Sequence, residues 1–289
     1  TGTLIINKKG EFLEKVSALD SVGGWISHLF EYISGSLKEV TFEVYALEDI
    51  KAADGESEDY YKKDDLIATI TTDETGVAKL TDIPLGKYYV KEKETANGYV
   101  LDSTAREIDL TYRDQDTAEV TYSSDWQNNR QKAEVKVLKK EKDSDRVLEG
   151  AVFALCNKED IVNANGDVIL KADTVIEEQA TDKEGKLTFT ADLPIGYTYY
   201  VKETSPAPGF ATTDQVQEFT FEYDGADKET LSYEFTFEDE PTVVEITKTS
   251  LTDGKELEGA KLEVTDEDGK VVDSWTSGKE AHIIKELVA

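Results

Sequence analysis

The stretch Tyr88-Tyr89-Val90-Lys91-Glu92 recurs further along the chain as Tyr199-Tyr200-Val201-Lys202-Glu203. A Pro-x-Gly turn signal precedes each copy, at Pro84-Leu85-Gly86 and at Pro194-Ile195-Gly196. Within each copy the first Tyr, the Val and the Glu occupy alternate positions, which is the period of a β-strand with one buried face. The repeat therefore predicts two similar modules built from strands.

A second repeat divides the chain further. Leu148-Glu149-Gly150-Ala151-Val152-Phe153 recurs as Leu257-Glu258-Gly259-Ala260-Lys261-Leu262, with a weaker copy at Leu37-Lys38-Glu39-Val40-Thr41-Phe42. Short alternating strands separated by turn signals are typical of β-sandwiches, so we expect an all-β fold of tandem sandwiches. The expected modules are 1–131, 132–240 and 241–289, the last being the N-terminal part of a truncated third module. Because no Gly/Ser linker separates them, we expect a stiff string.

The first module contains an insertion at about 11–36, because Lys8 and Leu37 are 20 residues further apart than their counterparts Lys139 and Leu148. Its apolar residues are spaced three and four apart, which predicts a short amphipathic helix interrupted at Gly23-Gly24. We expect this helix to pack on the sandwich; a contact site for a preceding domain or a partner is the alternative. The apolar positions are Val16, Leu19, Val22, Trp25, Ile26, Leu29, Phe30 and Ile33.

Charged side chains occupy positions where the alternation calls for apolar ones. In the first strand of each module a Lys follows two apolar residues on the same face, and a Glu and an Asn or Asp take such positions in later strands. The separation from Glu92 to Asn128 is 36 residues, as is that from Glu203 to Asp239. Asn129 is the neighbouring alternative to Asn128. The positions are Lys8, Lys139 and Lys248, then Glu92 and Glu203, then Asn128 and Asp239.

Burying a Lys and a Glu costs several kcal/mol each unless the charges are paired or neutralised. One interpretation is that these side chains lie at strand ends and reach water. The other is that burial lowers the pKa of the Lys and raises that of the Glu, which gives a neutral amine next to a proton donor. Such an amine can attack the side-chain carbon of Asn128 or Asp239 and form an isopeptide bond, releasing ammonia or water respectively. The matched spacing in two modules favours this chemistry.

The motif set resembles the Cna protein B-type domain, which supplies stalk and pilin modules to sortase-anchored surface proteins of Gram-positive bacteria. The resemblance implies Ig-like or prealbumin-like β-sandwiches, each with a self-formed Lys–Asn or Lys–Asp bond and a helper Glu. By matched position these are Lys8, Asn128 and Glu92, then Lys139, Asp239 and Glu203. Lys248 is a donor without its partners. The first module departs from the pattern at Glu39 and at Thr95-Ala96-Asn97, and no sorting signal or pilin motif is present.

Composition narrows the functional classes. The net charge is -30, which disfavours nucleic acid and anionic membranes as partners. Two His and one Cys cannot form a Cys/His zinc site, and no cofactor motif is present. No apolar run is long enough to cross a bilayer, and no catalytic triad is indicated, so we expect no enzyme beyond autocatalytic cross-linking. Because Met is absent even at position 1, we expect a piece of a longer chain.

The expected function is a structural stalk or pilin segment of a cell-surface adhesin, located outside the cell on a Gram-positive cell wall. The alternative is a direct ligand-binding adhesin module that recognises a host protein or glycan. Expected partners are the neighbouring modules of the same chain, with other pilin subunits or a host extracellular-matrix ligand as further candidates.

Overall fold

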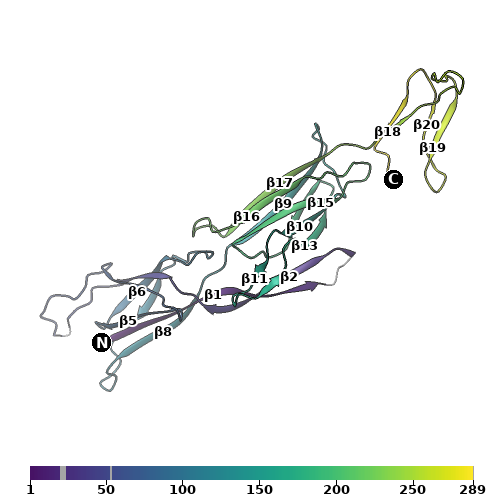
Figure 1. Cartoon of the computed structure of the whole chain (residues 1–289). Coiled ribbons are helices and arrows are strands. Elements are labelled where there is room, and N and C mark those ends of the chain that lie inside the picture. Colours follow the sequence, from purple (N-terminus) through teal and green to yellow (C-terminus); the bar gives the residue numbers. More distant parts are fainter. Residues whose placement is uncertain (20–23, 53, 289) are drawn as a thin grey trace.

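The computed structural model describes residues 1–19, 24–52 and 54–288. Its extended elements are β-strands, and the described residues contain no α-helix. Figure 1 shows an elongated molecule in which the N-terminus lies near one end and the last strands lie at the other. The apolar side chains gather into two clusters, which we call the first core and the second core.

The first core lies between two sheets. One sheet places the first half of β1 between β5, which is antiparallel to it, and β8, which is parallel to it. The other has the order β4-β3-β6-β7. The alternation predicted from the sequence is present, because Leu4, Ile6, Tyr88 and Val90 are fully buried. The strands are β1 (Gly2–Leu19), β3 (Thr41–Ala46), β4 (Leu66–Thr71), β5 (Val77–Ile83), β6 (Lys87–Glu94), β7 (Arg106–Asp109) and β8 (Val120–Gln127).

The second core repeats this arrangement. The parallel pair β9–β17 corresponds to β1–β8, and the antiparallel pair β10–β15 corresponds to β3–β6. Tyr199, Val201 and Phe237 are fully buried here. The strands are β9 (Lys132–Glu141), β10 (Val152–Asn157), β11 (Ile161–Val162), β12 (Val168–Leu170), β13 (Val175–Ala180), β14 (Lys186–Phe189), β15 (Tyr197–Ser205), β16 (Val216–Phe221) and β17 (Thr230–Asp239).

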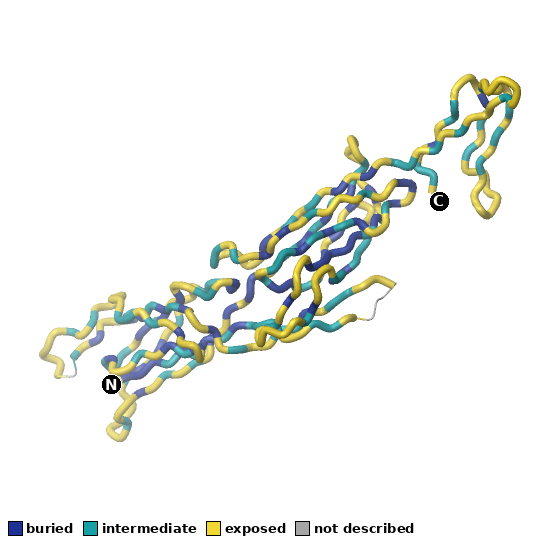
Figure 2. The backbone as a smooth tube through the Cα atoms, viewed as in Figure 1, coloured by how far each residue is buried: buried dark blue, intermediate teal, exposed yellow. Residues whose placement is uncertain are grey.

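The C-terminal strands form two separate antiparallel pairs, β18 with β21 and β19 with β20. Most of this segment is exposed (Figure 2). The exposed side chains include apolar ones, among them Val243 at 58% and Val271 at 47% exposure. The strands are β18 (Val243–Ile246), β19 (Lys261–Thr265), β20 (Val271–Thr276) and β21 (His282–Lys285).

The expectation of a helical insertion is wrong, because this segment forms a β-hairpin. Its first arm is the second half of β1, and its second arm is β2 (Ser27–Ser36), with Val16 opposite Phe30. The hairpin is apolar on both faces: Phe30 is 3% exposed and Ile33 is 47% exposed. Apolar residues on both faces of two strands produced the spacing that resembled a helix. Val22 and Gly23 lie outside the described residues.

Contacts with the second core explain why this segment forms strands rather than a helix. Ser27 of β2 pairs with Glu177 of β13, so the hairpin adds to a sheet of the second core. The Glu178 amide donates to the Ile26 carbonyl over 2.9 Å, and Phe30 packs within the second core. These tertiary contacts satisfy backbone groups at a sheet edge, and a helix could not do so. One continuous strand, β1, therefore serves both cores (Figure 1).

Candidate isopeptide sites

The first candidate site is formed where three strands of the first core meet. Lys8 lies on β1, Glu92 on β6, and Asn128 directly follows β8. The parallel register places Lys8 opposite Trp126. The backbone N–H of Asn128 donates to the Lys9 carbonyl over 3.1 Å. This register brings Lys8 and Asn128 side chains together from residues 120 positions apart.

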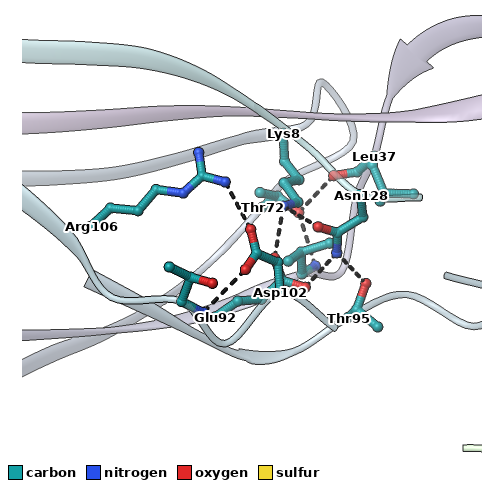
Figure 3. Close-up of polar contacts among 10 residues, drawn as sticks. Lys8, Leu37, Thr72, Glu92, Thr95, Asp102, Arg106 and Asn128 are labelled. Carbon is teal, nitrogen blue, oxygen red and sulfur yellow. Dashed lines mark hydrogen bonds and ion pairs between the residues drawn. The ribbon is translucent and has the colours of Figure 1, made fainter. Parts of the chain in front are cut away.

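The polar atoms of the first site contact one another directly (Figure 3). Lys8 Nζ lies 2.6 Å from Asn128 Oδ1 and 2.7 Å from Glu92 Oε2. Asn128 Nδ2 donates to Glu92 Oε1 over 2.5 Å and to Thr95 Oγ1 over 2.8 Å. Glu92 therefore bridges the amine and the amide nitrogen, which is the leaving group if the amine attacks the amide carbon.

The three side chains of the first site are buried. Lys8 is 1% exposed, Glu92 3% and Asn128 1%. Burial lowers the pKa of the Lys8 ammonium from its ordinary value of 10.5, although the hydrogen bond to Glu92 opposes this shift. The Phe42 ring centroid lies 5.7 Å from Lys8 Nζ. The buried site thus favours the neutral form of the Lys8 amine more than exposure to water would.

The second candidate site has the same construction. Lys139 lies on β9, Glu203 on β15 and Asp239 at the end of β17, all three buried. Lys139 Nζ contacts Asp239 Oδ1 and lies 3.0 Å from Glu203 Oε1. The register again places the Lys opposite an aromatic residue, Phe237, two positions before the acceptor. The two sites therefore match in position, and in each the Lys amine contacts both the acceptor and the Glu.

Electrostatics at the second site centre on the glutamic acid. Burial raises the pKa of Glu203 above its ordinary value, against the opposing effects of a hydrogen bond from the Thr213 amide and of Lys139. The Thr213 amide donates to Glu203 Oε2 over 3.0 Å. Asp239 Oδ2 is buried and has no hydrogen-bond partner among the described residues. Burial thus lets Glu203, beside Lys139, hold a proton more readily than an exposed glutamate does.

Other expected positions fall elsewhere. Asn129 is exposed, so Asn128 is the residue that contacts Lys8. Lys248 is exposed, and within the described part of the chain no carboxylate or amide side chain pairs with its Nζ. Sequence reasoning missed Thr95 and Thr213. Thr95 was visible only as a departure from the second repeat, and Thr213 acts through its backbone, which leaves no sequence signal.

The described residues also bear on metal binding and membrane insertion. Among residues 1–19, 24–52 and 54–288, no group of three or more His, Cys, Asp or Glu could hold a metal ion. The described chain has no helix long and apolar enough to cross a membrane. Cys156 is buried in β10, and burial raises the pKa of its thiol.

Comparison with known proteins decides the family. The family model of the SpaA prealbumin-like fold domain matches residues 33–126 and 133–235. The chain belongs to this family. It carries two copies of the domain, and the resemblance to prealbumin-like domains of the Cna B type is confirmed. No curated protein matches the chain.

A solved structure shares the fold, and others match with lower TM-scores. The Bacillus anthracis TIE protein is 24% identical with a TM-score of 0.57, and the match covers 99% of this chain and 43% of that protein. The chain therefore spans less than half the length of that protein. BcpA, the major pilin subunit of Bacillus cereus, is 14% identical with a TM-score of 0.39, covering 99% of this chain and 85% of BcpA. The shaft pilin SpaA from Lactobacillus rhamnosus GG is 18% identical with a TM-score of 0.27, covering 83% of this chain and 97% of SpaA.

Proposed function

We propose that this chain is a stalk or pilin segment of a Gram-positive cell-surface adhesin, stiffened by two self-formed isopeptide bonds. The bonds join Lys8 to Asn128 and Lys139 to Asp239, with Glu92 and Glu203 as helper acids. The observation that carries the proposal is the repeated buried triad, in which each Lys amine touches both its acceptor and its helper acid. Membership of the prealbumin-like family supports the structural role.

At the first site, Lys8 Nζ gives a proton to Glu92 Oε2 and becomes a neutral nucleophile. The amine attacks Cγ of Asn128, and the bond from Cγ to Nδ2 breaks. Of the three ammonium protons, one stays on the new amide, one remains on Glu92, and one leaves with the departing nitrogen as ammonia. The contacts of Glu92 with both nitrogens, at 2.7 Å and 2.5 Å, suit it to this transfer.

At the second site the acceptor is an acid, so water leaves instead. Lys139 first gives one proton to Asp239 Oδ1, which its Nζ contacts, and the neutral amine then attacks Cγ of Asp239. A second proton from the amine joins the same oxygen, which leaves as water, and the third stays on the new amide. Glu203 is protonated before and after the step and polarises the acceptor while the oxygen departs. Its raised pKa and its contact with Lys139 support this role.

The bonds have a mechanical consequence. In each domain the bond would join the first strand to the segment ending the last strand, so tension entering one strand leaves through the covalent bridge. The bridges span 120 and 100 residues. By analogy with disulfides, closing such loops stabilises each domain by about 4–5 kcal/mol. The hairpin of β1 and β2 would lie within the first loop, outside the path of tension.

The remaining parts of the proposal follow from this role. The modules are 1–131, 132–240 and 241–289, with Lys248 as an unpaired donor in the third. The chain would be displayed outside the cell on a Gram-positive cell wall, with its neighbouring modules and other pilin subunits as partners.

Intact mass spectrometry tests the proposal directly. With both bonds formed, the protein weighs less than its sequence by one ammonia and one water. Tryptic digestion should release branched peptides joining Lys8 to Asn128 and Lys139 to Asp239. A mass equal to that of the sequence would refute the proposal.

A further inference from the structure

We propose that Thr95 is a positioning residue that fits the first site to an asparagine acceptor. This inference rests on the proposed cross-linking function and deepens it, because it concerns which acceptor each site uses. Of the three reacting groups, the acceptor side chain is the one that donates a hydrogen bond to Thr95 among the described residues, so Thr95 acts by orienting Asn128 rather than by exchanging protons with Lys8.

The contacts of the acceptor amide carry the proposal. A primary amide has two N–H donors, and both need acceptors when the group is buried. Asn128 Nδ2 donates to Glu92 Oε1 over 2.5 Å and to Thr95 Oγ1 over 2.8 Å, which uses both donors. Figure 3 shows Thr95 and Glu92 meeting the same nitrogen. Oδ1 is left facing Lys8 Nζ.

The second site differs at both matching positions. Glu94 pairs with Thr41 and Ser205 pairs with Val152, each directly after a bulge, so the next residues, Thr95 and Pro206, are equivalent. Pro206 has no polar side chain, and the acceptor there is an acid without N–H groups. Oδ2 of this acid, Asp239, has no hydrogen-bond partner among the described residues. A hydroxyl that can accept a hydrogen bond from an N–H is thus present at the site where Lys attacks an amide. It is absent at the site where Lys attacks an acid.

This pairing matters for the reaction. Rotating the Asn128 amide by half a turn would set Oδ1 against the Glu92 carboxylate and Nδ2 against Lys8, and both contacts are unfavourable. Thr95 adds a second acceptor that holds the productive orientation. Thr95 is also partly exposed, whereas the other three residues of the site, Lys8, Glu92 and Asn128, are buried. The departing nitrogen is therefore held on the side from which ammonia can reach water.

The experiment follows bond formation in the full chain. Protein recovered unlinked in urea, as checked by its mass, is refolded, sampled into acid, and digested to quantify both branched peptides. Thr95→Val keeps the shape but removes the hydroxyl, and it should slow the first bond by about threefold to tenfold, the effect of one lost hydrogen bond. Thr95→Ser should restore the rate. The second bond is the internal control and should form at an unchanged rate.

Changing the acceptor separates orientation from a general structural effect. In an Asn128→Asp background, Thr95→Val should no longer slow the first bond, because the acid has no N–H for Thr95 to accept. Conversely, Asp239→Asn should form the second bond slowly, and adding Pro206→Thr should accelerate it. Equal slowing by Thr95→Val with both acceptors, or no slowing with Asn128, would overturn the inference. Neither result would contradict the proposed function, because that proposal fails only if the bonds themselves do not form.

Discussion

Lys8 Nζ lies 2.6 Å from Asn128 Oδ1 although 120 residues separate the two in the chain. The parallel pairing of β1 with β8 creates this proximity, and the pairing of β9 with β17 creates the same one between Lys139 and Asp239 over 100 residues. The difference between the two separations is the hairpin insertion, which lengthens the loop without moving either reacting group. Register between the first and last strands is therefore what defines each site.

The helper acids should be required for cross-linking. Glu92→Ala should leave the first domain folded but unlinked, because no buried group then takes a proton from Lys8 or passes one to the leaving nitrogen. Glu203→Ala should do the same at the second site. Intact mass reports each loss separately: ammonia should be retained in the first variant and water in the second.

Glu94→Ala is the matched control for the helper acid. Glu94 lies on the same strand as Glu92 but is exposed, so its removal should leave both bonds intact. Complete cross-linking in Glu92→Ala would show that Glu92 is not the catalyst at the first site.

The two bonds should respond differently to pH. Because burial lowers the pKa of Lys8, its amine becomes neutral at a lower pH than an ordinary lysine, whose pKa is 10.5. The first bond should therefore form faster as pH rises, and its rate should level off before pH 10.5. At the second site burial raises the pKa of Glu203, so the helper acid loses its proton only above its ordinary range, and bond formation should slow beyond that point.

The measurement is the rate of refolding-coupled cross-linking in buffers of increasing pH, with each branched peptide quantified. The ratio of the first rate to the second should increase with pH. A ratio that is constant across the range would contradict the view that deprotonation of Lys8 limits the first rate and that deprotonation of Glu203 limits the second.

The burial of the candidate site residues could be predicted from the sequence because strand alternation is a local signal. Lys8, Glu92 and Asn128 share the parity of Leu4, Val90 and Trp126, and the structure buries all six. Repetition in the second domain then indicated which charged positions belong together. Local parity could not reveal Thr95, since that residue follows the end of β6.

The hairpin could not be predicted because its conformation depends on a partner strand far away in the sequence. Val16, Phe30 and Ile33 have spacings that fit a helix as well as a two-faced hairpin. The pairing of Ser27 with Glu177 and the burial of Phe30 in the second core decide between the two. Tertiary contacts thus overrode a local period.

The hairpin should contribute to the stability of the second domain. Phe30→Ala should destabilise that domain by about 3–5 kcal/mol, because removing the Phe30 ring opens a cavity in the second core. Ile33→Ala, on the same strand but 47% exposed, is the control and should have little effect. Hydrogen exchange should show faster exchange in β13 for Phe30→Ala alone. Unchanged protection of β13 would mean that the two domains are not coupled through the hairpin.

A salt-bridged arginine reinforces this coupling. Arg130 is 7% exposed and its Nη2 lies 2.6 Å from Asp192 Oδ2, while its guanidinium stacks over the Tyr32 ring at 3.4 Å. Tyr32 also donates to the Asp192 carbonyl over 2.9 Å. The junction between the two domains is therefore held by the polar contacts of the buried Arg130 as well as by Phe30.

The last prediction concerns what the bonds do for the protein. A domain of this size is typically stable by only 5–15 kcal/mol, so losing a bridge worth about 4–5 kcal/mol is a large change. Lys139→Ala should lower the melting temperature of the second domain by on the order of 15 °C and expose its lysines to trypsin. Because this variant also removes a buried charge, Asp239→Ala is needed beside it, and the loss common to both reports the bond. Lys248→Ala should change neither the mass lost through cross-linking nor the melting temperature, since Lys248 is exposed. If both unlinked variants resisted heat and trypsin as well as the parent, the bonds would not be what makes this chain fit to carry tension.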